Sequence, residues 1–175
     1  MKRTFLACMM TVALLGFAAC KSGEDKKDEE NKHYAEQMVG DYDVVYSGTV
    51  TVNVPTEGER SVNIPQRNTT ATLSLDGDDG HVKMVMDRVT TTGYVDKEGL
   101  HLNSQNANDL LSSIGLPSEF SFLQGLQADI TIKYTTAPLL SKSATSWNGN
   151  FSGNVSYSIV TVPVNGTLNY TATKK

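Results

Sequence analysis

The sequence predicts an all-β protein, an antiparallel up-and-down barrel of about eight strands with a short helix near residues 107–114. The chain from residue 34 onward is rich in residue types that favour strands, with 17 Thr and all 7 Tyr. Apolar and polar residues alternate with a period of two in segment after segment, and turn-forming residues separate the segments. Nearly all of these segments can pair as antiparallel neighbours, and closing them into a barrel removes exposed sheet edges.

The clearest strand runs from Asp41 to Val54. Its even positions are all apolar or Gly, whereas Val45 alone interrupts the polar odd positions. Side chains on a strand point alternately to its two faces, so the even positions should face the interior of the barrel. A strand of this length should bend, and Gly48 is the residue at which we expect the bend.

The later strands show the same alternation. We expect a hairpin turn at Asp76–Gly80, and a bulge or a turn near residue 160, where the apolar positions change parity. After the first strand, the expected strands lie near 71–75, 82–86, 93–95, 100–102, 130–134, 151–159 and, in a single parity, 160–172.

The segment 106–115 has a different pattern. Asn residues at its start, apolar residues at positions 110, 111 and 114, and Gly115 at its end predict a helix of two turns. Residues 106–126 together carry eight large apolar side chains, including Phe122. We expect this segment to cover one end of the barrel.

The first 19 residues have the pattern of a cleaved export signal. Lys2 and Arg3 precede an apolar run that is too short to span a membrane comfortably. The run ends in Ala18-Ala19-Cys20, which resembles the lipobox of a bacterial lipoprotein. The resemblance implies cleavage before Cys20 and attachment to a membrane by lipid on that cysteine. The alternative is an ordinary cleaved signal that happens to contain a cysteine.

Residues 20–33 are charged and lack aliphatic or aromatic side chains after the cysteine, which predicts a flexible tether. Their acidic clusters, Glu24-Asp25 and Asp28-Glu29-Glu30, resemble the export signal of Bacteroidetes surface lipoproteins. This resemblance implies an outer-membrane lipoprotein exposed at the cell surface. The alternative is a hydrophilic spacer on a lipoprotein that faces the periplasm.

Residues 34–175 resemble the calycin-like, or lipocalin-like, β-barrel domains of Bacteroidetes lipoproteins. The residues that carry the resemblance are the opening Val39–Gly48 segment, Gly93-Tyr94-Val95 and the closing Val164–Lys174 segment. The resemblance implies a lipocalin-like barrel, and most domains of this kind have no assigned activity.

The composition excludes several classes of function. Both cysteines, Cys8 and Cys20, lie in the first 20 residues, so the expected barrel has no disulfide and no zinc site built from cysteines. The formal net charge of -4 argues against a nucleic-acid-binding protein with a broad basic surface.

No motif indicates catalysis, a metal or a cofactor. The chain has no Gly-x-Ser-x-Gly sequence, and His33, His81 and His101 lack the spacing of a metal motif, even with Asp79. The Asp76–Gly80 segment lacks the ligand pattern of an EF-hand and is better explained as a turn. We therefore expect a protein that is not an enzyme and needs no cofactor.

A barrel of eight strands is either filled by its own side chains or has room for one small ligand. We expect a lipid-anchored protein that binds a small or apolar molecule inside the barrel. The alternative is a surface protein that recognises a glycan or a partner protein through its loops, with Trp147 as an exposed aromatic. An apolar stripe is also the ordinary core of a filled barrel. The candidate ligand-lining residues are Tyr42, Tyr46, Met84, Met86, Phe122 and Trp147.

Overall fold

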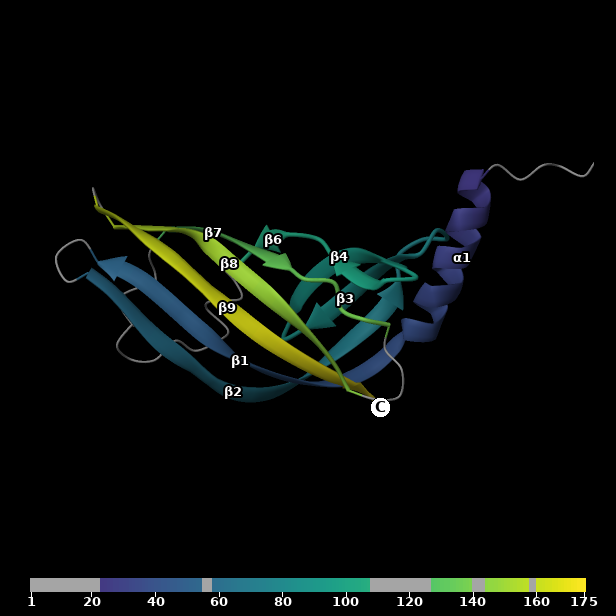
Figure 1. The fold of residues 1–175 in the computed structure, drawn as a ribbon, viewed down its shortest axis with the longest axis horizontal. Coiled ribbons are helices and arrows are strands. Elements are labelled where there is room, and N and C mark those ends of the chain that lie inside the picture. Colours follow the sequence, from purple (N-terminus) through teal and green to yellow (C-terminus); the bar gives the residue numbers. More distant parts are fainter. Residues whose placement is uncertain (1–22, 55–57, 108–126, 140–143, 158–159) are drawn as a thin grey trace, which may run out of the picture.

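The computed structural model describes residues 23–54, 58–107, 127–139, 144–157 and 160–175. A nine-stranded antiparallel sheet curls strongly into a half-barrel, with one helix at an end (Figure 1). The predicted all-β, barrel-like fold is confirmed, with nine strands where about eight were expected. The helix is α1 (Gly23–Met38), and the strands are β1 (Gly40–Val54), β2 (Gly58–Leu75), β3 (His81–Met86), β4 (Val89–Asp96), β5 (Gly99–Leu102), β6 (Gln105–Asn106), β7 (Gln127–Tyr134), β8 (Thr145–Tyr157) and β9 (Val160–Lys174).

The strands follow an up-and-down order with one unpaired junction. Their order in the sheet is β5-β4-β3-β2-β1-β9-β8-β7-β6, so almost every strand pairs with its neighbours along the chain, and β1 pairs with β9. In the described residues no ladder joins β5 to β6. Instead, an isolated bridge between Leu100 of β5 and Ala137, just after β7, connects the two edges of the sheet. We call this junction the seam.

The alternation predicted for β1 is present. Tyr42, Val44 and Tyr46 are buried, as are Val50 and Val52 farther along the strand. The register between β1 and β2 shifts between Tyr46 and Gly48. A Cβ atom at position 48 would collide with the main-chain oxygen of a β9 residue, so the glycine permits the close approach of these strands.

The predicted turn at Asp76–Gly80 is confirmed, and of the two alternatives near residue 160, a bulge or a turn, the strand pairing fits the turn. β2 and β3 pair from Leu75 opposite Val82, on either side of the Asp76–Gly80 turn. β8 and β9 pair up to Tyr157 opposite Val160, so the change of parity marks a hairpin turn.

The N-terminal helix corrects the prediction of a flexible tether over 20–33. Residues Gly23–Met38 form α1, and Ala35 in its last turns is fully buried. Packing of this end stabilises the helix, and side-chain pairs four residues apart extend it through the charged segment, as where Tyr34 donates to Glu30 at 3.2 Å. The sequence prediction counted the absence of apolar residues but missed this docking.

α1 covers one end of the barrel (Figure 1). Met38 is buried in the same core as the strands, and its main-chain oxygen accepts a hydrogen bond from the Tyr42 hydroxyl. Lys174 Nζ donates to the main-chain oxygen of Gln37 at 2.8 Å. The helix is therefore part of the folded domain rather than a spacer before it.

Several predictions fall outside the described residues. The predicted signal peptide and Cys20 lie within 1–22, which is outside the described residues. Phe122 and all but the first residue of the helix predicted near 107–114 lie within 108–126, which is also outside them. Ala107, the last described residue before that gap, is buried. Within the described ranges, no helix is both long and apolar enough to cross a membrane.

Candidate functional site

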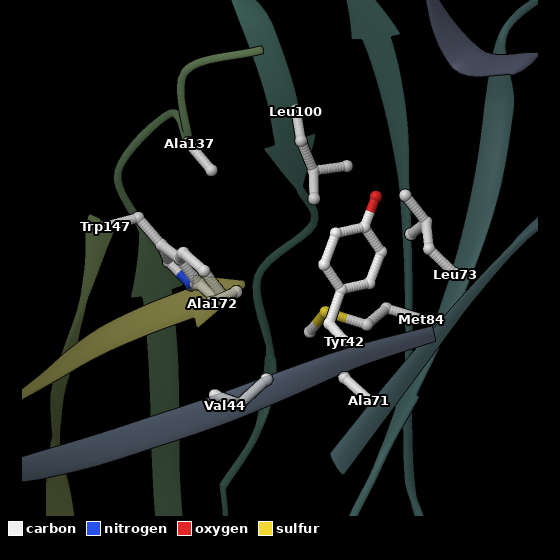
Figure 2. Close-up of a pocket in the computed structure, with 9 residues that line it drawn as sticks. All are labelled: Tyr42, Val44, Ala71, Leu73, Met84, Leu100, Ala137, Trp147 and Ala172. Carbon is white, nitrogen blue, oxygen red and sulfur yellow. The ribbon is translucent and has the colours of Figure 1, made fainter. Parts of the chain in front are cut away.

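An apolar cavity lies inside the barrel, next to the seam. Figure 2 shows side chains converging on it from several strands, with Ala137 and Trp147 on one side and Tyr42, Leu73 and Met84 on the other. Its volume is about 20 Å³, roughly enough for one water molecule. The barrel is thus nearly filled here. The lining residues are Tyr42, Val44, Ala71, Leu73, Met84, Leu100, Ala137, Trp147 and Ala172.

Trp147 joins this cavity to a cluster of aromatic rings, which consists of Tyr46, Tyr134, Trp147 and Tyr170. The indole ring is stacked on Tyr170 with a centroid distance of 5.2 Å and an interplanar angle of 11°. Tyr46 and Tyr134 lie 5.9 and 6.3 Å from the same tyrosine ring. Four strands, β1, β7, β8 and β9, supply one ring each, so the cluster spans the interior of the sheet.

Two polar atoms in this cluster have no hydrogen-bond partner. Among the described residues, they are the only buried side-chain polar atoms without one: the indole Nε1 of Trp147 and the hydroxyl of Tyr170. Such an unpaired group costs about 1–3 kcal/mol, and native proteins contain few of them. Both residues are at least 95% buried, since their exposed fractions are 5% and 1%. Both groups are therefore able to donate a hydrogen bond to a polar atom placed beside them.

The hydroxyl groups of two other interior tyrosines, Tyr134 and Tyr42, do have hydrogen-bond partners. Tyr134 accepts a hydrogen bond from Gln105 Nε2 at 2.9 Å, and Tyr42 donates to a main-chain oxygen of α1. Burial raises the pKa of the Tyr42 hydroxyl to about 12. It also raises the pKa of Tyr170, with a smaller effect of Tyr134 and Tyr46. The hydroxyl of Tyr170 is therefore protonated at neutral pH and can donate a hydrogen bond.

The seam closes directly over the cavity. The amide of Leu100 donates to the oxygen of Ala137 at 2.8 Å, and the reverse bond measures 2.9 Å. Both residues line the cavity. Gly99 has a φ of +138°, and a Cβ there would collide with the Ala137 oxygen, so only glycine allows this approach. His101 Nδ1 lies 3.2 Å from Thr136 Oγ1 and adds one side-chain contact.

The predicted ligand-lining residues separate into three groups. Tyr42, Met84 and Trp147 line the cavity. Tyr46 belongs to the aromatic cluster, and Met86 is buried in the core without lining the cavity. Phe122 lies outside the described residues. Because Trp147 is buried, it is not the exposed sugar-stacking platform considered from the sequence.

Sequence reasoning missed the residues that complete the site, above all Tyr170, Leu100 and Ala137. Tyr170 shares parity with the buried Leu168 and Ala172, so its inward direction was visible in the sequence. Its stacking on Trp147 depends on the β8–β9 register, in which these two residues are opposite each other. The residue pattern of either strand alone does not encode this β8–β9 register.

The described residues contain one group with metal-ligand geometry. The ligand atoms of Asp96, Glu98 and His101, around the β4–β5 turn, all lie within 4.8 Å of one another. The Asp96 carboxylate already accepts bonds from the amides of Glu98 (2.8 Å) and Gly99 (3.3 Å) and lies 2.9 Å from His101 Nε2. These contacts hold the turn together and account for the grouping. His81 lies apart from it, 2.6 Å from Asp79.

Comparison of the chain with protein-family models, with curated protein sequences and with solved structures found no match. The resemblance to calycin-like lipoproteins therefore stays a prediction from the sequence.

Proposed function

We propose that this protein is a non-enzymatic binding protein that takes up one small, mostly apolar, ring-bearing molecule inside its barrel. The observation that carries the proposal is the pair of unpaired polar atoms, Trp147 Nε1 and the Tyr170 hydroxyl, on two stacked rings beside an apolar cavity. An indole N–H only donates, so the guest has a hydrogen-bond acceptor as well as a flat apolar body. Offset stacking on these rings adds to the affinity.

The guest enlarges the cavity as it binds. Pockets for drug-sized ligands measure roughly 300–1,000 Å³, far more than the resting space beside Trp147. Two features favour expansion. Met84 is flexible enough to repack, and the main-chain pairing over the cavity is a single bridge, supported by the His101–Thr136 side-chain contact. Opening the seam moves Leu100 and Ala137 away from the cavity without breaking any strand ladder.

The sequence supports the location of this protein. A lipid on Cys20 attaches it to a membrane of the cell envelope, and the acidic clusters after that cysteine favour the outer membrane, with the barrel facing either the cell surface or the periplasm. A Cys20→Ser variant should appear in the soluble fraction. Retention of that variant in the membrane fraction would contradict lipid anchoring.

Recognition of a glycan or a partner protein through the loops has less support. Its aromatic candidate, Trp147, is buried, and the exposed ring of Tyr94 is stacked on His101 of the neighbouring strand. We therefore do not propose it as a second function.

Titration with the neutral fluorescent dye N-phenyl-1-naphthylamine tests the proposal. We expect a saturable rise in dye fluorescence with one site per chain. An Ala172→Leu variant, which fills the cavity from β9, should abolish the rise. Thr173→Leu is the matched control, because it adds a Leu at the next position, on the exposed face. Equal dye binding by the two variants, or no binding by the wild-type protein, would overturn the proposal.

A further inference from the structure

A second, polar pocket lies at the edge of the aromatic cluster. It is lined by Tyr46, Arg67, Asn68, Asp87 and Arg88, and it opens to solvent with a volume of about 350 Å³. Tyr46 is only 4% exposed, and its ring lies 5.9 Å from that of Tyr170. One tyrosine therefore belongs both to the polar pocket and to the cluster with the unpaired polar atoms.

Arg67 of β2 is exposed, but it lies in the row of the strand that faces the inside of the sheet. It pairs directly with Tyr46 of β1, and residues directly opposite each other on antiparallel strands point to the same face. The same inward row continues through Thr69 to Ala71 and Leu73, which are buried. A guanidinium thus lies at the exposed end of the apolar row, where it can reach both the polar pocket and solvent.

A strained turn carries the second guanidinium of this pocket, that of Arg88. Asp87 and Arg88 form the two-residue turn between β3 and β4, with φ values of +49° and +69°. Turns of this kind normally use Asn or Asp followed by Gly, and a bulky residue is unfavourable in the left-handed region. The hydroxyl of Thr69 donates to the Asp87 carboxylate and holds the turn against β2. Strain that is maintained in this way often marks a functional site.

The donors of this pocket are free to bind a guest. In the described part of the chain, neither guanidinium group has a hydrogen bond or an ion pair with another side chain. The lining carries two positive charges against one negative charge, that of Asp87. Burial, and to a lesser degree Asp87, raises the pKa of Tyr46, whose hydroxyl therefore stays a hydrogen-bond donor at neutral pH.

We propose that this pocket binds an oxyanion, so that the ligand of this protein is a small ring-bearing organic acid, with its carboxylate or sulfonate held by Arg67, Arg88 and the Tyr46 hydroxyl. Guanidinium groups bind carboxylates and other oxyanions with paired, charge-assisted hydrogen bonds. The ring of the acid then lies against Tyr46, next to Tyr170. The inference rests on the proposed function, because the body of the ligand occupies the aromatic interior.

Two fluorescent probes with the same ring skeleton test the inference. N-phenyl-1-naphthylamine is neutral, and 8-anilino-1-naphthalenesulfonate adds one sulfonate to it. The wild-type protein should bind the anionic probe about tenfold more tightly than the neutral one, as expected for a charge-assisted hydrogen bond. Added salt should weaken the binding of the anionic probe and leave the binding of the neutral probe unchanged. Arg67→Gln and Arg88→Gln should each remove most of the preference and leave the affinity for the neutral probe unchanged.

Lys83→Gln is the matched control, because it removes one positive charge from an exposed position on β3, away from the pocket. It should preserve the preference for the anion. Arg67→Lys should restore part of it, since the charge returns without the paired donors. Circular dichroism confirms that each variant is folded.

The outcomes separate the two proposals. Equal affinity for both probes in the wild-type protein, or an equal loss for both in the Arg variants, overturns the oxyanion inference and leaves the proposed function standing. Arg-dependent binding of the sulfonate without any binding of the neutral probe overturns the proposed function and supports the polar pocket alone. Binding of neither probe overturns both.

Discussion

The sheet is joined to itself at two very different places. β1 and β9, which come from opposite ends of the chain, pair without interruption from Tyr42 opposite Lys174 to Val52 opposite Val164. At the seam, β5 meets the segment after β7 through one bridge of two hydrogen bonds. The first junction holds the fold together, and the second covers the cavity. The proposed function uses this division, because opening the seam would admit a guest while the β1–β9 ladder stays paired.

Glycine-to-alanine substitutions at the two junctions test most strongly whether the β1–β9 junction is more rigid than the seam. In Gly48→Ala, the new Cβ collides with a main-chain oxygen of β9 at a point where ladders clamp β1 on both sides. Neither partner strand can move away without losing its own pairing. We expect the free energy of unfolding to fall by about 3–4 kcal/mol, measured by chemical denaturation. A fall below 1 kcal/mol would show that the β1–β9 junction yields easily.

Alkaline pH should lower the free energy of unfolding through the buried hydroxyl of Tyr42 on β1. The Tyr42 hydroxyl on β1 has its pKa raised from 10.0 to about 12 by burial, so the unfolded chain ionises before the folded one. The stabilising effect is complete below pH 10, and it is lost as the pH rises from about 10 to about 12. The free energy of unfolding should therefore fall across this window. Tyr42→Phe should make the fall shallower, and an unchanged slope would contradict the assignment.

Gly99→Ala makes the same chemical change at the seam, where its Cβ would collide with the Ala137 oxygen. Here the strands can separate, so the collision costs the two bridging hydrogen bonds, about 1–3 kcal/mol in total, and the φ of +138° adds backbone strain to this loss. Hydrogen exchange at the amides of Leu100 and Ala137 should accelerate, and the neutral dye should enter faster in stopped-flow measurements. Slower dye entry would show that the seam is not the opening element.

Tyr170→Phe tests the unpaired hydroxyl with the smallest change. Removing a buried polar group that lacks a partner should stabilise the protein by about 1 kcal/mol, seen as a shift of the denaturation midpoint. Tyr134→Phe is the control, because the hydroxyl it removes is bonded to Gln105, and it should destabilise. Destabilisation by Tyr170→Phe of the same size would mean that the hydroxyl already has a partner.

The local features of this fold were predictable from the sequence, whereas its long-range pairings were not. The parity of β1 predicted which of its side chains are buried, because alternation depends only on neighbouring residues. A bend was expected at Gly48, where the structure has a shift in the β1–β2 register and a close approach of β9. The helix over 23–38 was missed because its stability comes from docking of Ala35 on distant strands.

The candidate site shows the same division. Tyr42, Met84 and Trp147 were expected to face inward, and they line the cavity. The contribution of Leu100 and Ala137 depends on a bridge between residues far apart in the chain, which no pattern indicates. Arg67 was overlooked although it shares parity with the buried row of β2. A charged residue in an apolar row was the available signal.

Binding of a guest in the barrel interior can be observed directly at the indole N–H of Trp147. Its nuclear magnetic resonance signal is measured during titration with 1-naphthol. The chain has one Trp, so a single indole signal reports on the proposed site. Because Nε1 lacks a partner in the resting structure, a guest with a hydroxyl oxygen should shift this signal downfield until one equivalent is bound. A signal that stays in place while the protein becomes saturated with naphthol would contradict binding in the barrel interior.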